Sequence, residues 1–572
     1  MNRNQDIERM KYVLVVFSAC LLCACGKNKN GNQRLHDGVD TAYVSSVWVS
    51  DQGDGTYINP ILDADYSDPD VCQNGGDYYM TASSFTSVPG LPILHSTDLV
   101  NWKLIGHGVQ ELLPKDHYAV PRHGCGVWAP NIKYHNSVYY IYWGDPDFGI
   151  FRVTATDPAG PWTSPELVKA GKGLIDPSIL WDDDGKVYMS HAFAGSRSGI
   201  NSIAVIQEMD ATAAYPIGPE VLIVDGNVEG NHTLEGTKLY KRDGFYYVFA
   251  PAGGVEYGWQ IVARSKHIYG PYAVKTVLAQ GETDINGPHQ GAWVETLAGQ
   301  SWFLHFQDKE YLGRVLHLNP VEWIDGWPVM GIDSDGDGCG WPVRQHKKPD
   351  VGAVYSIETP VESDGFDSPE LGLQWSWNAN PRVGWAFPSS NGYLRLYAEY
   401  WSPNHVNLWD VPNLLLQKIP TDSFTATTAV KLRSREGEDR VGLVVFGNDY
   451  AALSLKFKAG LFWLEHVSCQ QAMEGTQEVI HASLPLQPDA RFEIPSLAFE
   501  KEVYLRVVFM AGGLCQFSYS LDNVVFSPIG KVCRVSKGRW VGAKMGLYCI
   551  APPKSISGKE KGWADVDWFV VE

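Results

Sequence analysis

One pattern limits the fold of this chain more than any other. A tight turn followed by an aromatic strand occurs five times: "NGGDYYMTAS" (74–83), "HNSVYYIYWG" (135–144), "DDGKVYMSHA" (183–192), "RDGFYYVFAP" (242–251) and "AGQSWFLHFQ" (298–307). Asp-Gly, Asn-Ser and Gly-Gly pairs favour the short connections of β-hairpins. The copies are spaced by roughly 50–60 residues, close to the period of propeller blades. We therefore predict a five-bladed β-propeller over residues 55–345, with a β-sandwich that reuses aromatic hairpins as the alternative.

Three acidic side chains precede these hairpins at nearly the same distance. Asp68, Asp176 and Glu235 lie 11, 12 and 12 residues before the hairpin tyrosines of their repeats. Trp128 and His289 lie 12 and 14 residues before the corresponding aromatic residues of the other two repeats. Equivalent positions of successive blades surround one axis, so we expect these five side chains at one end of the central channel.

Three facing carboxyl groups need a chemical reason, because like charges raise one another's pKa values. Hydrolysis of a glycosidic bond uses one ionised carboxylate to activate water and one protonated carboxyl to assist the leaving oxygen. A separation of ~6.5–9.5 Å leaves room for that water and gives inversion. A third carboxylate would keep the pKa of the acid high and orient it. Binding of a cation by the three acids is the alternative.

Composition narrows the class of ligand. Short runs of Val, Ile, Tyr and Phe between Gly, Asp and Asn clusters predict an all-β protein. The formal net charge of −19 argues against nucleic acid or an anionic membrane surface as a partner. The 21 Trp and 28 Tyr residues suit a ligand with flat apolar faces, such as sugar rings. We therefore expect a neutral carbohydrate partner.

The N-terminus has the features of a processing segment. The apolar run "YVLVVFSACLLCA" is too short to span a bilayer and is typical of a signal peptide. The following "LCAC" resembles a bacterial lipobox, which would make Cys25 the lipidated first residue; an ordinary signal peptide is the alternative. We predict a lipoprotein signal peptide over 1–25, a flexible tether over 26–54, and attachment through lipid to the cell envelope, on the outer-membrane surface or in the periplasm.

Three segments carry a resemblance to glycoside hydrolase family 43: "NPILDADYSDPDV", "LIDPSILWDDDGKVYM" and "LEGTKLYKRDGFYYVF". The resemblance implies a five-bladed propeller and an inverting mechanism. It implies Asp68 as the general base, Glu235 as the general acid, and Asp176 as the residue that modulates the pKa of the acid and orients it.

Weaker matches imply further site residues. "GVWAPNI" implies Trp128 as a sugar platform, although Asn131 stands where the family more often has Asp. "LGRVLHLNPVEW" implies that Arg314 contacts the substrate near the acid, as suits a guanidinium. "GPHQGAWVE" implies His289 beside a central calcium ion or water cluster, with a core histidine without metal as the alternative.

Phe85 and Phe148 are further candidates for lining the pocket. We expect no cofactor in catalysis and leave room for a structural calcium ion. Two acidic features are set aside. Glu229 in "NVEGN" lies six residues out of phase. The stretch "DSDGDG" (333–338) resembles the start of an EF-hand loop, but Arg344 stands at its twelfth position, so we predict a tight turn.

A second domain follows a polar, proline-containing linker predicted over 346–364. Residues 365–572 alternate between apolar and polar side chains, as in "RVGLVVFGN" and "VYLRVVFM", and predict a β-sandwich. "DGFDSPELGLQWSWN" and "WADVDWFVVE" resemble the concanavalin-like jelly-roll domain of the β-xylosidase-type members. There this domain can close one side of the active site, which implies a pocket; a domain that only stabilises or binds carbohydrate is the alternative.

These observations together predict an inverting exo-glycosidase. It would remove non-reducing terminal β-D-xylose or α-L-arabinofuranose from plant hemicellulose, as fragments of xylan, arabinoxylan or arabinan. A non-catalytic cell-surface carbohydrate-binding propeller and an endo-acting arabinanase are the alternatives.

Overall fold

The computed structural model describes residues 42–572 except 401, 403, 435–437, 459, 487–500 and 553–561. The chain divides into two units, 1–41 and 42–572, and the described residues all belong to the second. The predicted signal peptide and Cys25 lie outside the described residues. Within the described part, no helix has the length and apolar character needed to cross a membrane.

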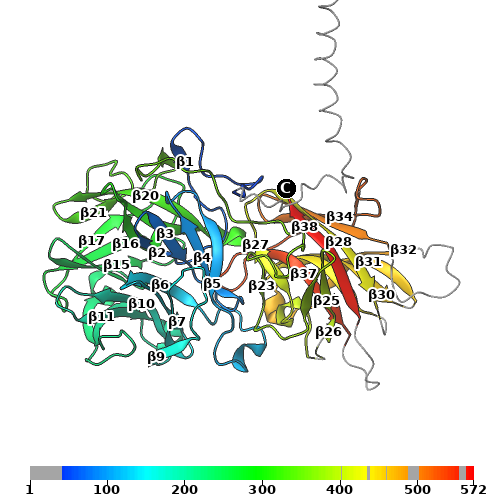
Figure 1. The fold of residues 1–572 in the computed structure, drawn as a ribbon, viewed down its shortest axis with the longest axis horizontal. Helices are drawn as coiled ribbons and strands as arrows, with labels where there is room; N and C mark the ends of the chain where they lie inside the picture. Colours follow the sequence, from blue (N-terminus) through cyan, green and yellow to red (C-terminus); the bar gives the residue numbers. More distant parts are fainter. Residues whose placement is uncertain are drawn as a thin grey trace, which may run out of the picture. The chain divides into compact units, whose positions relative to one another are not determined.

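Five four-stranded antiparallel sheets follow one another along the first half of the chain (Figure 1). Blade 1 has β2 (Asp70–Asn74), β3 (Asp77–Thr81), β4 (Gly90–Ser96) and β5 (Lys103–Val109). Blade 2 has β6 (Trp128–His135), β7 (Val138–Asp145), β8 (Gly149–Ala155) and β9 (Glu166–Ala170). Blade 3 has β10 (Leu174–Trp181), β11 (Val187–Phe193), β12 (Ile203–Met209) and β13 (Val221–Asp225). Blade 4 has β14 (Lys238–Arg242), β15 (Phe245–Ala252), β16 (Trp259–Ser265) and β17 (Ala273–Leu278). Blade 5 has β18 (His289–Glu295), β19 (Ser301–Asp308), β20 (Arg314–Ile324) and β21 (Trp327–Met330).

The predicted five-bladed propeller is confirmed, and each predicted hairpin joins the first two strands of a blade. The ring is closed by β1 (Thr56–Ile58), which pairs with β22 (Gln345–Lys347). Four short helices lie between strands: η1 (His117–Ala119), α2 (Gly195–Ser198), α3 (Gly226–Glu229) and η2 (Glu310–Leu312).

Side chains at the start of the inner strands connect neighbouring blades. The Asn131 amide donates to Asp70 Oδ2 at 2.6 Å, and its oxygen accepts from the backbone N–H of Ile179 at 2.9 Å. Lys238 Nζ donates to the backbone oxygen of Pro130 at 2.7 Å. Asn131, which departs from the family's commoner residue, therefore links three blades through both ends of its amide.

The C-terminal half is a sandwich of two eight-stranded sheets (Figure 1), which confirms the predicted fold class. The first contains β23 (Ser376–Trp377), β26 (Glu399–Tyr400), β27 (Leu415–Lys418), β29 (Arg440–Phe446), β30 (Tyr450–Lys458), β31 (Leu461–Cys469), β32 (Val479–Leu486) and β37 (Lys544–Ala551). The second contains β24 (Ala386–Ser389), β25 (Tyr393–Tyr397), β28 (Phe424–Arg433), β33 (Val503–Met510), β34 (Leu514–Ser520), β35 (Ser527–Pro528), β36 (Cys533–Arg534) and β38 (Trp563–Val571). The 3-10 helices η3 (Leu408–Asp410) and η4 (Ala472–Glu474) complete it. Buried aliphatic and aromatic side chains of both sheets form its core.

The segment before β1 corrects one prediction. Residues 26–54 were expected to form a flexible tether, but their described part packs against the domain linker. Ser45 Oγ and the Tyr43 hydroxyl donate to the Glu362 carboxyl at 2.7 and 3.0 Å. Trp48 Nε1 donates to the backbone oxygen of Pro60 at 3.2 Å. Because these donors find buried acceptors, the chain is held to the fold from Tyr43 onwards.

Candidate active site

A left-handed residue stands at the start of the inner strand of every blade. The five residues and their φ angles are Asp68 (54°), Ala129 (36°), Asp176 (56°), Gly236 (62°) and Gln290 (51°). In blades 2, 3 and 5 the ladder between the first two strands has a register shift at this point. A non-glycine residue in this region costs roughly 1–3 kcal/mol and persists only where its surroundings hold it. Such bulges re-aim side chains, and here they do so at one end of the ring.

The left-handed position corrects the phase that we counted from the hairpins. Asp68 and Asp176 occupy it, whereas Glu235, Trp128 and His289 each precede it by one residue. The count from the tyrosines misses this offset because the blade 3 hairpin is longer by one residue: Leu180 pairs with Tyr188, whereas Tyr240 pairs with Tyr247. Glu235 therefore stands one residue before the position that Asp68 and Asp176 occupy in their blades.

Hydrogen-bond donors surround the buried Asp68 carboxylate. Ser83 Oγ and Ser67 Oγ donate to Asp68 Oδ2 at 2.5 and 2.9 Å. Arg314, the first residue of β20, places Nη1 3.1 Å from Asp68 Oδ1. Ser83 Oγ also accepts from the backbone N–H of Ala129 at 2.7 Å, so its hydroxyl proton is directed at the carboxylate. These hydrogen bonds and the ion pair with Arg314 fix the orientation of the Asp68 carboxylate.

Asp176 lies beside Glu235 because its carboxylate is hydrogen-bonded to Gly236, the residue that follows Glu235. The backbone N–H of Gly236 donates to Asp176 Oδ2 at 2.6 Å, and Thr237 Oγ1 donates to the backbone oxygen of Asp176 at 2.8 Å. A Cβ on Gly236 would lie 2.7 Å from Pro251, so this left-handed position has no room for a side chain. The absence of a side chain at Gly236 thus allows Asp176 and Glu235 to lie close together.

The two neighbouring carboxyls share a raised affinity for protons. Burial raises the pKa of Glu235 to about 8, and the charges of Asp176 and Asp68 add to the rise while Arg314 opposes it. Burial also raises the pKa of Asp176 to about 7, with the Gly236 N–H opposing the rise and Asp68 adding to it. The structure therefore brings Asp68, Asp176, Glu235 and Arg314 together, and the raised pKa of Glu235 keeps this carboxyl protonated at neutral pH; the catalytic roles of the four residues stay predictions.

Phe85 and Trp128 form an aromatic wall close to the groups that hold Asp68, because Phe85 follows Ser83 by two residues and Trp128 precedes Ala129, whose N–H donates to Ser83 Oγ. The rings of Phe85 and Trp128 meet edge to face at 6.2 Å, and the guanidinium of Arg197 lies 5.6 Å from the Trp128 ring centre. Phe148 packs instead on His117 and Tyr118. No contact in the described part joins Phe148 to the acids, so its place in the pocket stays a prediction.

A loop of the sandwich reaches this wall. Trp540 meets Trp128 edge to face at 6.5 Å, and a Cβ on Gly124 would lie 2.5 Å from the side chain of Arg539. The backbone N–H of Gly542 donates to Asp65 Oδ2 at 2.9 Å, in the segment that leads to Asp68. Sequence reasoning missed Trp540, because the loop belongs to another domain and follows no repeat.

His289 is a buried neutral histidine. Its Nδ1 lies 3.1 Å from the backbone oxygen of Gly287, and its Nε2 has no hydrogen-bond partner among the described residues. Burial and the charge of Arg314 lower its pKa to about 3. Calcium prefers oxygen ligands, so an unpartnered imidazole nitrogen does not fit a direct calcium ligand. It fits an acceptor for a water molecule or a sugar hydroxyl.

The two acidic features that were set aside lie away from this site. Glu229 ends the short helix α3 and is exposed. The carboxylates of Asp333, Asp335 and Asp337 lie within 4.8 Å of one another in a largely exposed turn. The backbone N–H groups of the turn donate to Asp333, as the predicted tight turn requires.

Comparison with known proteins decides the family. Residues 57–328 match the family "Glycosyl hydrolases family 43", and residues 363–572 match the "Beta xylosidase C-terminal Concanavalin A-like domain". A relative from Xylanibacter ruminicola is 36% identical over 513 residues, which span 89% of each chain. The chain belongs to glycosyl hydrolases family 43. The predicted resemblance is confirmed, and this family 43 protein is a glycoside hydrolase.

Relatives of this family 43 enzyme are named for xylose, for arabinofuranose or for both sugars. The beta-xylosidase of Formosa agariphila is 32% identical over 607 residues, covering 98% of this chain and 97% of its own. The non-reducing end alpha-L-arabinofuranosidase BoGH43B of Bacteroides ovatus is 31% identical, covering 69% of this chain and 74% of its own. The crystal structure of the xylan beta-1,4-xylosidase from Bacillus halodurans matches with a TM-score of 0.76 at 25% identity, over 90% of this chain and 99% of that one.

Proposed function

We propose that this family 43 hydrolase removes single pentose units, β-D-xylose or α-L-arabinofuranose, from the non-reducing ends of hemicellulose fragments with inversion. The observation that carries the proposal is the contrast between its carboxyls. Asp68 accepts hydrogen bonds from Ser83, Ser67 and Arg314, whereas burial and Asp176 raise the pKa of Glu235 to about 8. Environments that separate two carboxyls in this way assign the base and the acid.

Each group has one step in the reaction. Asp68 takes a proton from the attacking water as the water oxygen bonds to the anomeric carbon. Glu235 gives its proton to the glycosidic oxygen as the bond between that oxygen and the anomeric carbon breaks. Asp176 keeps the pKa of Glu235 high and holds its backbone through Gly236. Exchange with solvent then returns a proton to Glu235 and removes one from Asp68.

The sandwich loop supports an exo mode of action. Trp540 stands against Trp128, so the second domain contributes to the aromatic wall. A wall built from two domains suits a pocket for one terminal sugar. Trp128 and Phe85 would supply its apolar surface, and the Arg314 guanidinium would donate hydrogen bonds to the sugar hydroxyl groups. Relatives are named for xylose, for arabinofuranose or for both, and the proposal retains both sugars.

The test is a side-by-side initial-rate assay on aryl β-D-xyloside and aryl α-L-arabinofuranoside, with Glu235→Ala as the blank. We expect turnover of one or both, abolished in the blank, and NMR of the first-formed sugar should show the inverted anomer. Oligosaccharide binding without product would contradict the proposal in favour of a carbohydrate-binding protein. A mixture of long oligomers from a polysaccharide would favour an endo-acting enzyme.

We further propose that lipid on Cys25 holds the enzyme at the cell envelope, with about a dozen apolar residues before it as signal peptide. Cys25→Ser should move the protein from the membrane fraction to the soluble fraction. The chemistry proposed for the carboxyls uses no cofactor, and a structural calcium ion remains a prediction without a part in it.

A further inference from the structure

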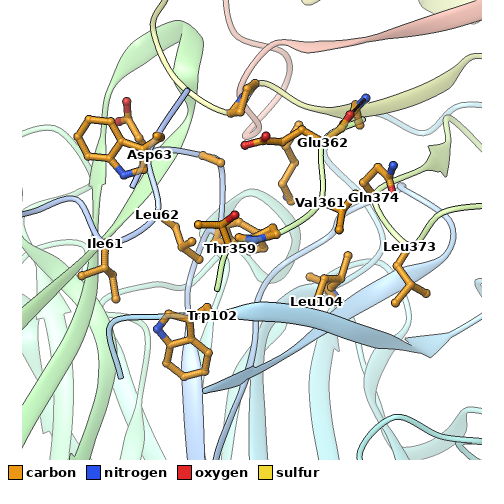
Figure 2. A pocket seen from close by; sticks show the side chains of 18 of the residues that line it. Ile61, Leu62, Asp63, Trp102, Leu104, Thr359, Val361, Glu362, Leu373 and Gln374 are labelled. Carbon is orange, nitrogen blue, oxygen red and sulfur yellow. Dashed lines mark hydrogen bonds between the residues drawn. The ribbon is translucent and has the colours of Figure 1, made fainter. Parts of the chain in front are cut away.

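A cavity of about 100 Å³, partly open to solvent, lies between blade 1, the domain linker and the sandwich (Figure 2). None of the candidate catalytic residues lines it. Figure 2 shows side chains from all three parts around it: Ile61, Leu62, Asp63, Trp102, Leu104, Thr359, Val361, Glu362, Leu373 and Gln374. Its lining combines apolar side chains with a few polar and charged groups, as small-molecule sites do.

Three basic side chains line this cavity: Lys418 of β27, Lys544 of β37 and His107 of β5. Lys418 and Lys544 are direct partners across the antiparallel strands. Like charges placed directly opposite one another destabilise a strand pair. Burial and the Lys418 charge lower the pKa of Lys544 to about 8 and that of His107 to about 4. In a chain of net charge −19, the two lysines bring positive charge into one cavity, whereas His107 is neutral.

The protein supplies only part of the counter-charge. Lys418 Nζ donates to the backbone oxygen of Asp65, and Lys544 Nζ donates to Ser87 Oγ. Both acceptors are uncharged, and in the described part of the chain neither lysine forms an ion pair with a carboxylate. The Asp65 carboxylate interacts electrostatically with both lysines at longer range. It also accepts hydrogen bonds from the backbone N–H groups of Arg314 and Gly542. Each ammonium has three donors, so an anion in the cavity would find partners.

The domain linker lines the cavity with groups of a different character. The Glu362 carboxyl accepts from Ser45 and Tyr43, and burial raises its pKa to about 7. Thr359 and Gln374 also line the cavity, and Leu104 adds apolar surface. An inorganic anion would meet the lysines alone. An occupant with a carboxylate at one end and hydroxyl groups on a compact body would meet the lysines and these polar groups together.

We propose that this cavity binds a sugar acid, with its carboxylate between Lys418 and Lys544 and its hydroxyl groups facing Thr359, Gln374 and Glu362. The occupant would contact blade 1, the linker and the sandwich at once and so stabilise their packing. This site is separate from the hydrolytic one, and its occupancy is measured without turnover, so the proposal stands or falls independently of the proposed function.

The probe is D-glucuronate, titrated calorimetrically into the full chain, with D-glucose as the matched control that has a hydroxymethyl group in place of the carboxylate. We expect glucuronate to bind at least about tenfold more tightly than glucose, because charge-assisted hydrogen bonds are lost with the carboxylate. Lys544→Met and Lys418→Met, which keep the apolar stems, should each weaken glucuronate binding about tenfold by the same argument. Neither lysine touches the catalytic groups, so both variants should retain their rate on aryl glycosides.

A second readout uses the wild-type chain and needs no variant to fold. An anion beside Lys544 favours its charged form, so binding at pH 8 should take up protons, measured as a dependence of the apparent enthalpy on the buffer. The titratable groups that interact with the Lys544 charge are Lys418, Asp65 and the buried His123. Equal affinity for glucose, displacement of glucuronate by xylose, unchanged affinity in both variants or absence of proton uptake would each overturn the proposal.

Discussion

At the scale of single residues, the proposed catalysis depends on the proton affinity of Glu235. Burial and the neighbouring Asp176 charge raise its pKa to about 8, so the acid is protonated at neutral pH and the rate should fall as pH rises through about 8. Asp176→Asn removes the charge but keeps an oxygen acceptor for the Gly236 N–H. The basic limb of kcat/KM should then move to lower pH by about one unit. A basic limb that stays in place would show that Asp176 does not set the proton affinity of the acid.

Ser83 is predicted to position the base. Its hydroxyl accepts from Ala129 N–H and donates to Asp68, so Ser83→Ala leaves the carboxylate less firmly oriented. Loss of a hydrogen bond to a charged group corresponds to about 10- to 100-fold in rate. The loss should be the same for good and poor leaving groups, because the serine acts only on the water side.

Two further substitutions, one at Ser83 and one at the next residue, serve as controls for this prediction. Ser83→Thr keeps the hydroxyl and should recover most of the rate. Ser84→Ala removes the next hydroxyl, which accepts from Leu91 N–H and does not touch Asp68, and should have little effect. A larger loss with Ser84→Ala than with Ser83→Ala would contradict the assigned role.

At the scale of elements, the hairpin repeat was enough to predict the blades and the three acids. The pairs of turn and aromatic residues are local signals, and a regular repeat places equivalent positions around one axis. The one-residue offset of Glu235 was not predictable, because it arises from a bulge and from the longer hairpin of blade 3. The role of Asn131 was not predictable either, because its hydrogen bonds to Asp70 and Ile179 join strands that are distant in sequence.

The sandwich loop 536–542 was beyond sequence reasoning for the same reason, and it carries a prediction of its own. Trp540→Ala should raise KM for aryl pentosides about 3- to 10-fold with little change in kcat, because the ring adds binding surface without touching the acids. Val383→Ala, at a fully exposed site of the sandwich, is the matched control. An unchanged KM would remove the loop from the pocket.

At the scale of the whole molecule, the propeller and the sandwich share one interface. His123 of the propeller stacks on Trp409 at 3.8 Å, Val88 pairs with Trp377 through backbone hydrogen bonds, and the Asn380 amide bonds the backbone of Leu112. Contacts of this kind couple the two folds. We expect calorimetry to show a single unfolding transition for the whole chain. Two well-separated transitions would show that the domains unfold independently and that the interface contributes little.

The most direct test of the account is the leaving-group dependence of Glu235→Gln. Rates would be measured with a series of aryl glycosides of the preferred pentose, for the variant and the wild type. If Glu235 gives the proton, poor leaving groups should lose about 10²–10⁴-fold in kcat, whereas good leaving groups, which depart without a proton, should lose far less. An equal loss across the whole series would contradict the assignment of Glu235 as the acid.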